Sequence, residues 1–245
     1  MIDYIEYVFH ESHPVKVVST RRSGGFSQFP FDGLNLGEHV GDRPADVTKN
    51  RDLLLKEFGS QIDVVYLNQV HGTNIIHAEQ SGIASADGME ADGAVTSVRN
   101  IACAIMTADC LPLVLTNRSG TQVMTLHVGW RGLQRGIVQK GVALFEVEPS
   151  EIMAWAGPCI GTSAFEVGAE VKQQLQGPPE AWRLKDSKLG KWLCDLTLLT
   201  KYELSLQGVN QFSSAGECTF SSSKHYFSYR RDGQTGRQAT LAWIS

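Results

Sequence analysis

The chain lacks the segments that mark secreted and membrane-bound proteins. Its first residues, MIDYIEYVFHESHP, carry acidic residues early and have no apolar core, and no stretch approaches 18 uncharged apolar residues. We therefore expect neither a signal peptide nor a membrane span.

The cysteine pattern and the charge exclude further classes of protein. The five cysteines are an odd number, lie far apart and include no CxxC pair, which is not a disulfide framework. The net charge is −4 and no run of Lys and Arg occurs, which argues against nucleic acid or an anionic membrane as partner. These absences predict a cytoplasmic protein that acts on a small molecule.

Motifs of four common enzyme classes are also missing. The sequence contains no GxGxxG fingerprint, no GxxxxGK[ST] phosphate loop, no GxSxG elbow and no HExxH pair. No low-complexity tract, charge block or internal repeat divides its 245 residues, and a chain of this length can bury about 72% of its unfolded surface. We expect one domain over residues 1–245, either a monomer or a weak dimer.

Short apolar runs, many of them β-branched, dominate the sequence and predict strands. The expected strands cover residues 15–22, 64–72, 74–79, 94–97, 101–109, 112–117 and 121–129. Residues 152–161 are expected to form a strand and a turn, and residues 225–245 are expected to form strands around Asp232-Gly233 and Gly236. The expected helices cover residues 44–58, which Gly59 ends, 131–146, 168–176, and 196–208, which Asp195 caps. This order predicts a mixed α+β fold without regular βαβ alternation. The long loop at 26–44 is a candidate wall of a binding site.

Three candidate ligand residues lie where predicted strands end or turn: His71 in NQVHGTN, Cys110 in TADCLPL and His127 in LHVGWRG. Two histidines and a cysteine form a catalytic zinc set when the fourth position is left to water or substrate. The spacing matches no zinc finger, so only the fold can bring them together. Alternatives stay open, because each histidine can be a hydrogen-bonded structural residue and Cys110 with His127 can form a nucleophilic pair. Asp109 can orient a ligand, carry a proton or cap a turn.

Other residues are candidates for substrate binding. Arg131 opens a predicted helix directly after the strand of His127, where backbone N–H groups and a cation suit phosphate. Arg51 and Asn35, the latter in GLNLGEHVGD, are further candidates, with the alternatives of a surface cation and an ordinary loop residue. Aromatic residues that could stack on a purine, although such residues more often belong to a core, are Trp130, Phe26 and Phe165.

The order and density of several motifs carry a family resemblance. The sequence contains STRRSGGFS, NLGEHVGD, NQVHG, ADGAVTS, TADCLPLVL, HVGWRGL, GPCIG followed by FEVG, and SYRRDGQTGR. Over residues 15–243 it resembles the laccase-domain family, formerly labelled multicopper polyphenol oxidase and now regarded as zinc-dependent purine nucleoside phosphorylases with adenosine deaminase activity. The resemblance implies a single four-layer α/β/β/α sandwich similar to the catalytic domain of cytotoxic necrotizing factor.

For the site, the resemblance implies zinc ligands at His71, Cys110 and His127, each inside an intact motif. Cys110, His127, Asp109 and Arg131 become the expected catalytic residues, with Arg51, Asn35 and Arg131 expected to bind substrate. The implied reaction converts adenosine, inosine, guanosine or 5′-methylthioadenosine with phosphate into base and ribose 1-phosphate. The implied second reaction deaminates adenosine through a zinc-activated water.

Other functions remain as alternatives. Seven histidines without an HxH cluster argue against a true multicopper laccase, although a site with two histidines and a cysteine takes up copper as an adventitious metal. A cysteine amidohydrolase that uses Cys110 and His127 on a peptide or cell-wall precursor is the second hypothesis. A nucleoside-binding or metal-storage protein without turnover is the third.

Overall fold

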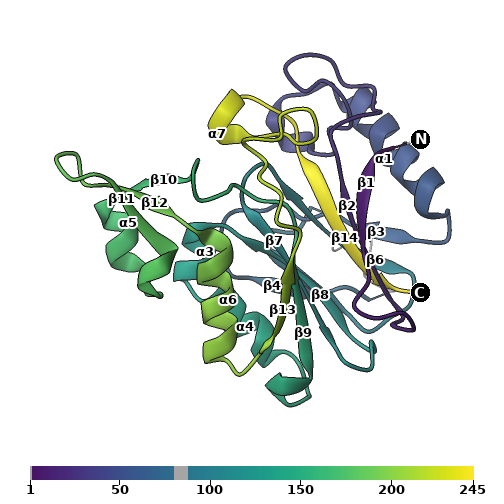
Figure 1. Cartoon of the computed structure of the whole chain (residues 1–245). Coiled ribbons are helices and arrows are strands. Elements are labelled where there is room, and N and C mark those ends of the chain that lie inside the picture. Colours follow the sequence, from purple (N-terminus) through teal and green to yellow (C-terminus); the bar gives the residue numbers. More distant parts are fainter. Residues whose placement is uncertain (1, 80–87) are drawn as a thin grey trace.

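The computed structural model describes residues 2–79 and 88–245, which form two large β-sheets and a smaller one. In the first large sheet the C-terminal strand lies beside an N-terminal strand, as Figure 1 shows in yellow and purple. The order of this sheet is β1 (Tyr4–Tyr7), β2 (Val15–Thr20), β14 (Gln238–Ile244), β6 (Ile101–Thr107) and β3 (Asp63–Val65). The pairing of β14 with both neighbours is antiparallel.

The second large sheet has fully buried strands at its centre. Its order is β13 (Gln211–Ser214), β9 (Ile152–Ala156), β7 (Leu111–Asn117), β8 (Val123–Val128), β5 (Gly93–Thr96) and β4 (Ile75–His77). Strand β7 pairs antiparallel with both β8 and β9, and every residue of these three strands is buried. Strands buried on both faces read as continuous apolar runs, which is why the sequence predicts them well.

Alternating side chains of the strands define the layers. Along β6, Ala102, Ala104 and Met106 pack in one cluster with residues of the helix α1 (Pro44–Phe58), whereas Ile101, Cys103 and Ile105 pack in another with residues of β4 and β5. A further cluster joins β2 and β14 of the first sheet to β7, β8 and β9 of the second. The two large sheets therefore pack face to face.

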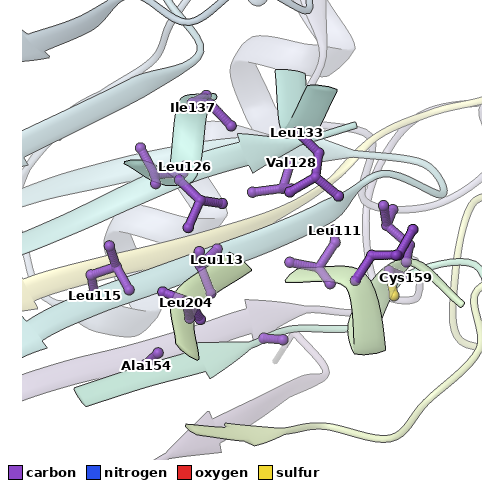
Figure 2. Close-up of a cluster of buried hydrophobic side chains, with 14 of the residues drawn as sticks. Leu111, Leu113, Leu115, Leu126, Val128, Leu133, Ile137, Ala154, Cys159 and Leu204 are labelled. Carbon is purple, nitrogen blue, oxygen red and sulfur yellow. The ribbon is translucent and has the colours of Figure 1, made fainter. Parts of the chain in front are cut away.

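Helices cover the outer face of the second sheet. These are α3 (Trp130–Gln134), α4 (Ile137–Ala143) and α6 (Leu196–Leu206). Figure 2 shows their cluster with strands β7, β8 and β9, formed by Leu111, Leu113, Leu115, Leu126, Val128, Leu133, Ile137, Ala154, Cys159 and Leu204. With α1 on the first sheet, the layers run α/β/β/α, so the expected mixed α+β sandwich is confirmed.

A small third sheet lies at one side of the molecule (Figure 1). It contains β10 (Glu166–Gly168), β12 (Lys191–Cys194) and β11 (Trp182–Asp186), and α5 (Ala169–Gln174) follows β10. The remaining elements are the short helix α7 (Tyr229–Asp232) and the 3₁₀ turns η1 (Glu38–Val40), η3 (Pro149–Glu151) and η4 (Pro179–Ala181). No helix in the described ranges has the length and hydropathy needed to cross a membrane.

Local signals explain the helices that the sequence predicted correctly. Helix α1 has proline in its first turn and ends at Gly59, which has a φ of 112°. Helix α6 begins after Asp195, whose side chain accepts a hydrogen bond from the backbone N–H of Leu198 and so satisfies one free donor of the first turn.

Three predicted elements are wrong in extent. The expected helix 131–146 is divided in two, because Gly136 adopts a left-handed conformation with a φ of 83° between α3 and α4. The expected strand 64–72 ends with β3 at Val65, and the segment beyond it approaches the second sheet instead. Of the strands expected over residues 225–245, the last is confirmed as β14, whereas residues 229–232 form the helix α7, whose first turn is capped by the Ser228 hydroxyl.

The central position of β7 makes its core leucines important for stability. Leu113 is fully buried between the second sheet and its helices, so Leu113→Ala should lower the free energy of unfolding by about 2–5 kcal/mol through lost burial and a residual cavity. Denaturant titration measures this change. Leu189→Ala is the control, since Leu189 is 70% exposed and should change stability by less than about 0.5 kcal/mol; equal effects would contradict the assigned core.

Candidate functional site

Three side chains that are far apart in sequence meet at one end of the second sheet. His71 lies on the segment leading into β4, Cys110 directly precedes β7, and His127 belongs to β8. One ligand atom from each lies within 4.8 Å of those of the other two. His71 Nε2 and Cys110 Sγ are 3.9 Å apart, and the two imidazole centroids are 4.7 Å apart. The pairing of β7 with β8, which sets His127 opposite Pro112, establishes this convergence.

A fully buried carboxylate, Asp92, organises the cluster. Its Oδ1 accepts a hydrogen bond from His127 Nδ1 at 2.7 Å and from the backbone N–H of His71 at 2.9 Å. Its Oδ2 accepts from the backbone N–H groups of Gly72 at 2.6 Å and Val70 at 3.2 Å. Because Nδ1 of His127 is engaged in this way, its Nε2 is left to act as a ligand atom, as in carboxylate–histidine–metal arrangements.

Asp109 supports the cluster from the other side. Its Oδ1 accepts a hydrogen bond from the Thr219 hydroxyl and its Oδ2 accepts from the backbone N–H of Arg230, both at 2.7 Å. The backbone of Asp109 has a φ of 106°, which is rare for a residue with a side chain. The carboxylate therefore holds a strained turn just before Cys110, and it ties that turn to α7.

The charges of these groups stabilise one another. Burial would raise the pKa of Cys110, but the charges and hydrogen bonds of His127 and His71 lower it to about 6. Burial would lower the pKa of His127, but Cys110 and Asp92 raise it to about 9. Burial likewise opposes ionisation of Asp92, yet His127 and the backbone N–H groups keep its pKa below the usual value. Without a metal, these shifts favour a thiolate on Cys110 beside an imidazolium on His127.

The donor set fits a metal ion that prefers nitrogen and sulfur ligands. Two imidazoles and a thiolate are available, and such sets suit zinc and copper better than magnesium or calcium. Gly129 leaves room for the donors, because a Cβ there would lie 3.0 Å from Cys110 Sγ and 3.2 Å from His71 Cδ2. Any larger residue at this position would crowd two of the three side chains of the cluster.

The cluster opens into a cavity of about 510 Å³, which is within the range of small-molecule sites. The predicted loop 26–44 contributes one wall through His39. Burial and the charges of Arg237 and Arg51 lower the pKa of His39, so this imidazole is neutral at neutral pH. Aromatic and cationic side chains form much of the remaining wall: Trp130, Phe165, Tyr229, Arg131, Arg230 and Arg237.

The predicted substrate-binding residues lie in different places. Arg131 lines the cavity, is exposed, and stacks on Trp130 at 4.5 Å. The helix α3 that contains it begins at the expected place but has only five residues, and anion binding by Arg131 stays a prediction. Phe165 also lines the cavity, whereas Phe26 lies outside its lining, under Lys49.

Arg51 and Asn35 do not line the main cavity. Arg51 forms an ion pair with Glu38 at 3.0 Å, stacks on Tyr66, and lines a neighbouring pocket of about 370 Å³. Asn35 is fully buried, and its amide group is bonded to Gly37 and Asp42. Asn35 thus supports the loop that bears His39 without lining the cavity itself.

Nearly the whole chain matches one known protein family. The model of a family described as multi-copper polyphenol oxidoreductase laccase matches residues 16–245. The chain belongs to this family.

Within this laccase family, curated relatives carry an enzymatic name. A Haemophilus influenzae protein named purine nucleoside phosphorylase is 39% identical over 234 residues, which are 94% of each chain. The Escherichia coli protein named purine nucleoside phosphorylase YfiH is 39% identical over 238 residues, again 94% of each.

Solved structures of similar proteins share the fold. A Neisseria meningitidis protein matches with a TM-score of 0.91 and 38% identity over 99% of both chains. YlmD from Geobacillus stearothermophilus matches with a TM-score of 0.87 and 31% identity, over 94% of this chain and 92% of that one.

Sequence reasoning missed several residues of the site in this laccase-family chain. Asp92 belongs to the motif ADGAVTS, and its signal was a carboxylate directly before a buried strand. Gln69 precedes His71 and holds the backbone of Met106 through two hydrogen bonds, of 2.8 and 2.9 Å. Arg237 lines the cavity from the end of SYRRDGQTGR. Nothing local in the sequence links these residues to Cys110.

Replacing Asp92 tests its control over the donors. Asp92→Asn replaces one carboxylate oxygen with an NH₂ group, which cannot accept the N–H groups that this oxygen accepted. The affinity for zinc should therefore fall about 10- to 100-fold. Competition against a chromophoric chelator measures this affinity. Asp52→Asn, on the exposed side of α1, is the control and should bind zinc like the unaltered protein; equal affinity in the two variants would show that the carboxylate does not orient the ligands.

The low pKa of Cys110 predicts a reactive thiolate in the metal-free protein. Alkylation of Cys110 by iodoacetamide should be half-maximal near pH 6, decrease below it and level off above pH 7. Cys103 and Cys194 should react far more slowly, since burial raises their pKa to about 12. Mass spectrometry of peptides measures each rate. Zinc should block labelling of Cys110, and unchanged labelling with bound zinc would mean that Cys110 is not a ligand.

Proposed function

We propose that this protein is a zinc-dependent purine nucleoside phosphorylase. The observation that carries the proposal is the cluster of His71, Cys110 and His127 at the base of a cavity lined by arginine and aromatic side chains. The names of relatives covering nearly the whole chain support the same activity. The reaction forms a bond from a phosphate oxygen to C1′ of the nucleoside, while the C1′–N9 bond breaks and the purine leaves with its electron pair.

The metal is proposed to be held by His71 Nε2, Cys110 Sγ and His127 Nε2, with Asp92 fixing the last imidazole. Zinc bound there would act as a Lewis acid on an oxygen of phosphate or ribose. Copper is proposed to be an adventitious occupant, since the same donor set binds it tightly.

The cavity walls suit the two substrates. Positive charge develops on the sugar as the glycosidic bond breaks, by analogy with glycoside hydrolysis, and a bound anion favours that charge. Arginines Arg131, Arg230 and Arg237 supply the cations for phosphate, and we assign Arg131 to the cavity mouth because it is exposed. Trp130 and Phe165 offer faces for a purine ring.

Roles for the other predicted residues follow from their contacts. Asp109 is proposed to position Cys110 rather than carry a proton, because both of its oxygens already accept hydrogen bonds. Arg51 and Asn35 are proposed to act on the substrate indirectly, through the loop that bears His39.

We propose one further activity at this site, and one alternative function remains. Deamination of adenosine needs a water activated at the same donors to attack C6, with loss of ammonia. A cysteine amidohydrolase is the second candidate function, because Cys110, His127 and Asp92 also form the series of contacts that a nucleophilic triad requires. The presence of His71 as a third donor favours the metal.

The biological setting is proposed from the same features. All five cysteines are unpaired, as in proteins of reducing compartments, so we propose a cytoplasmic enzyme. Residues 1–245 are proposed to act as one catalytic domain, in a monomer or a weak dimer.

Product analysis tests the proposed reaction. Zinc-loaded protein incubated with adenosine or inosine should release adenine or hypoxanthine with ribose 1-phosphate only when phosphate is present, and chromatography separates these products. Inosine formed from adenosine without phosphate would establish the deaminase activity.

Variants and an alternative substrate class complete this test. Cys110→Ala and His71→Ala should lose zinc and both reactions together, because each removes a ligand. Turnover retained in a metal-free variant would contradict the zinc mechanism. Absence of all products across the purine nucleosides, with hydrolysis of an amide substrate that His71→Ala retains, would favour the amidohydrolase.

A further inference from the structure

The three arginines that line the cavity are held in different ways. Arg131 is exposed, and its guanidinium stacks on Trp130. Arg230 uses Nη1 to donate to the backbone carbonyls of Ala164 and Glu166, at 3.2 and 2.9 Å, beside the small third sheet. Arg237 is only partly exposed and lines the cavity together with Cys110 and Asp109.

Backbone contacts fix the position of Arg237. Its own N–H donates to Asn35 Oδ1 at 2.8 Å, and its Nη1 donates to the carbonyls of Thr235 and Gly236, both at 2.9 Å. Gly37 allows the stem to pass, because a Cβ there would lie 2.9 Å from Cγ of Arg237. The fold thus positions this side chain through two segments that are about 200 residues apart.

No carboxylate in the described ranges forms an ion pair with Arg237. The carboxylate of Asp109, which also lines the cavity, is occupied by Thr219 and by the backbone of Arg230. Cys110 and Asp109 act on Arg237 electrostatically, but neither is bonded to its guanidinium. A guanidinium withdrawn from water is stabilised when oxygen acceptors bond to it directly, and an anion taken up from solution would supply them.

A guanidinium has five N–H donors in a fixed plane. The two on Nη1 of Arg237 are used by Thr235 and Gly236, which leaves the pair formed by Nε and Nη2. Such a pair matches two oxygens of one phosphate or carboxylate group.

We propose that Arg237 is the residue that binds the phosphate substrate, gripping two of its oxygens with Nε and Nη2 at the wall of the cavity shared with Cys110. This assignment rests on the proposed phosphorylase function. Arg131, exposed at the mouth, contributes less to the bound anion than Arg237, because its guanidinium lacks anchoring carbonyls and is open to solvent.

Steady-state kinetics with phosphate and inosine varied separately test the assignment. Loss of a two-point charged contact in Arg237→Gln should raise the KM for phosphate about 10- to 100-fold, while the KM for inosine changes less than about twofold. Arg237→Lys keeps the positive charge but loses the paired N–H donors, so its KM for phosphate should lie between those of the unaltered protein and Arg237→Gln. Arg131→Gln should raise the KM for phosphate less than Arg237→Gln. An unchanged KM for phosphate in Arg237→Gln would overturn the proposal.

One control variant and one second test variant separate this role from a general effect on folding. Arg118→Gln removes a surface cation that pairs with Glu151 and should leave both KM values unchanged. Gly37→Ala retains Arg237 but displaces its stem, and should also raise the KM for phosphate selectively. If Arg237→Gln does not fold, Arg237→Lys and Gly37→Ala decide the question. If neither variant raises the KM for phosphate selectively, the proposal is overturned.

Direct binding of inorganic phosphate distinguishes failure of this proposal from failure of the proposed function. Isothermal titration should detect phosphate binding to the zinc-loaded protein, and Arg237→Gln should weaken it by at least about tenfold. Loss of binding in this variant supports Arg237 as the anion residue even if no nucleoside reacts. Equal phosphate affinity in the two proteins contradicts it even if phosphorolysis occurs.

Discussion

The hydrogen bonds of one buried carboxylate, Asp92, hold the site together. This side chain, directly before β5, accepts hydrogen bonds from three consecutive backbone N–H groups at residues 70–72 and from the imidazole of His127. A buried charge without such partners would be strongly destabilising. Because the same two oxygens fix the His71 segment and the His127 ring, one residue couples the positions of two of the three donors and determines which nitrogen of His127 faces the cavity.

The backbone beside the donors is held in conformations that most residues avoid. His71, one of the donors, has a φ of 57°, and Asp109, directly before Cys110, has a φ of 106°. Such conformations persist where surrounding contacts determine them, and here Asp92 restrains the first while Thr219 and α7 restrain the second. The rigid second sheet supplies the frame, so that a thiolate and two imidazoles converge although they come from three separate segments.

Much of the fold and the donor set could be predicted because the signals are local. The strands β6, β7 and β8 are rich in apolar residues and buried throughout, α1 and α6 carry their own start and stop residues, and His71, Cys110 and His127 stand out as polar residues at strand ends. The rest depends on contacts distant in sequence. Arg237 contacts Asn35, which lies about 200 residues away in the sequence, and no hydrophobic periodicity predicts such a contact. The break at Gly136 was missed because an apolar stripe continues on both sides of it.

An anomalous-scattering measurement at the zinc edge, on crystals grown from zinc-loaded protein, tests the central claim most directly. The account predicts one strong peak bounded by His71 Nε2, Cys110 Sγ and His127 Nε2, with Asp92 still bonded to Nδ1 of His127. It also predicts that the peak disappears in crystals of Cys110→Ala. A zinc peak elsewhere, or no peak beside a free Cys110 thiolate, would contradict the account and make Cys110 a nucleophile.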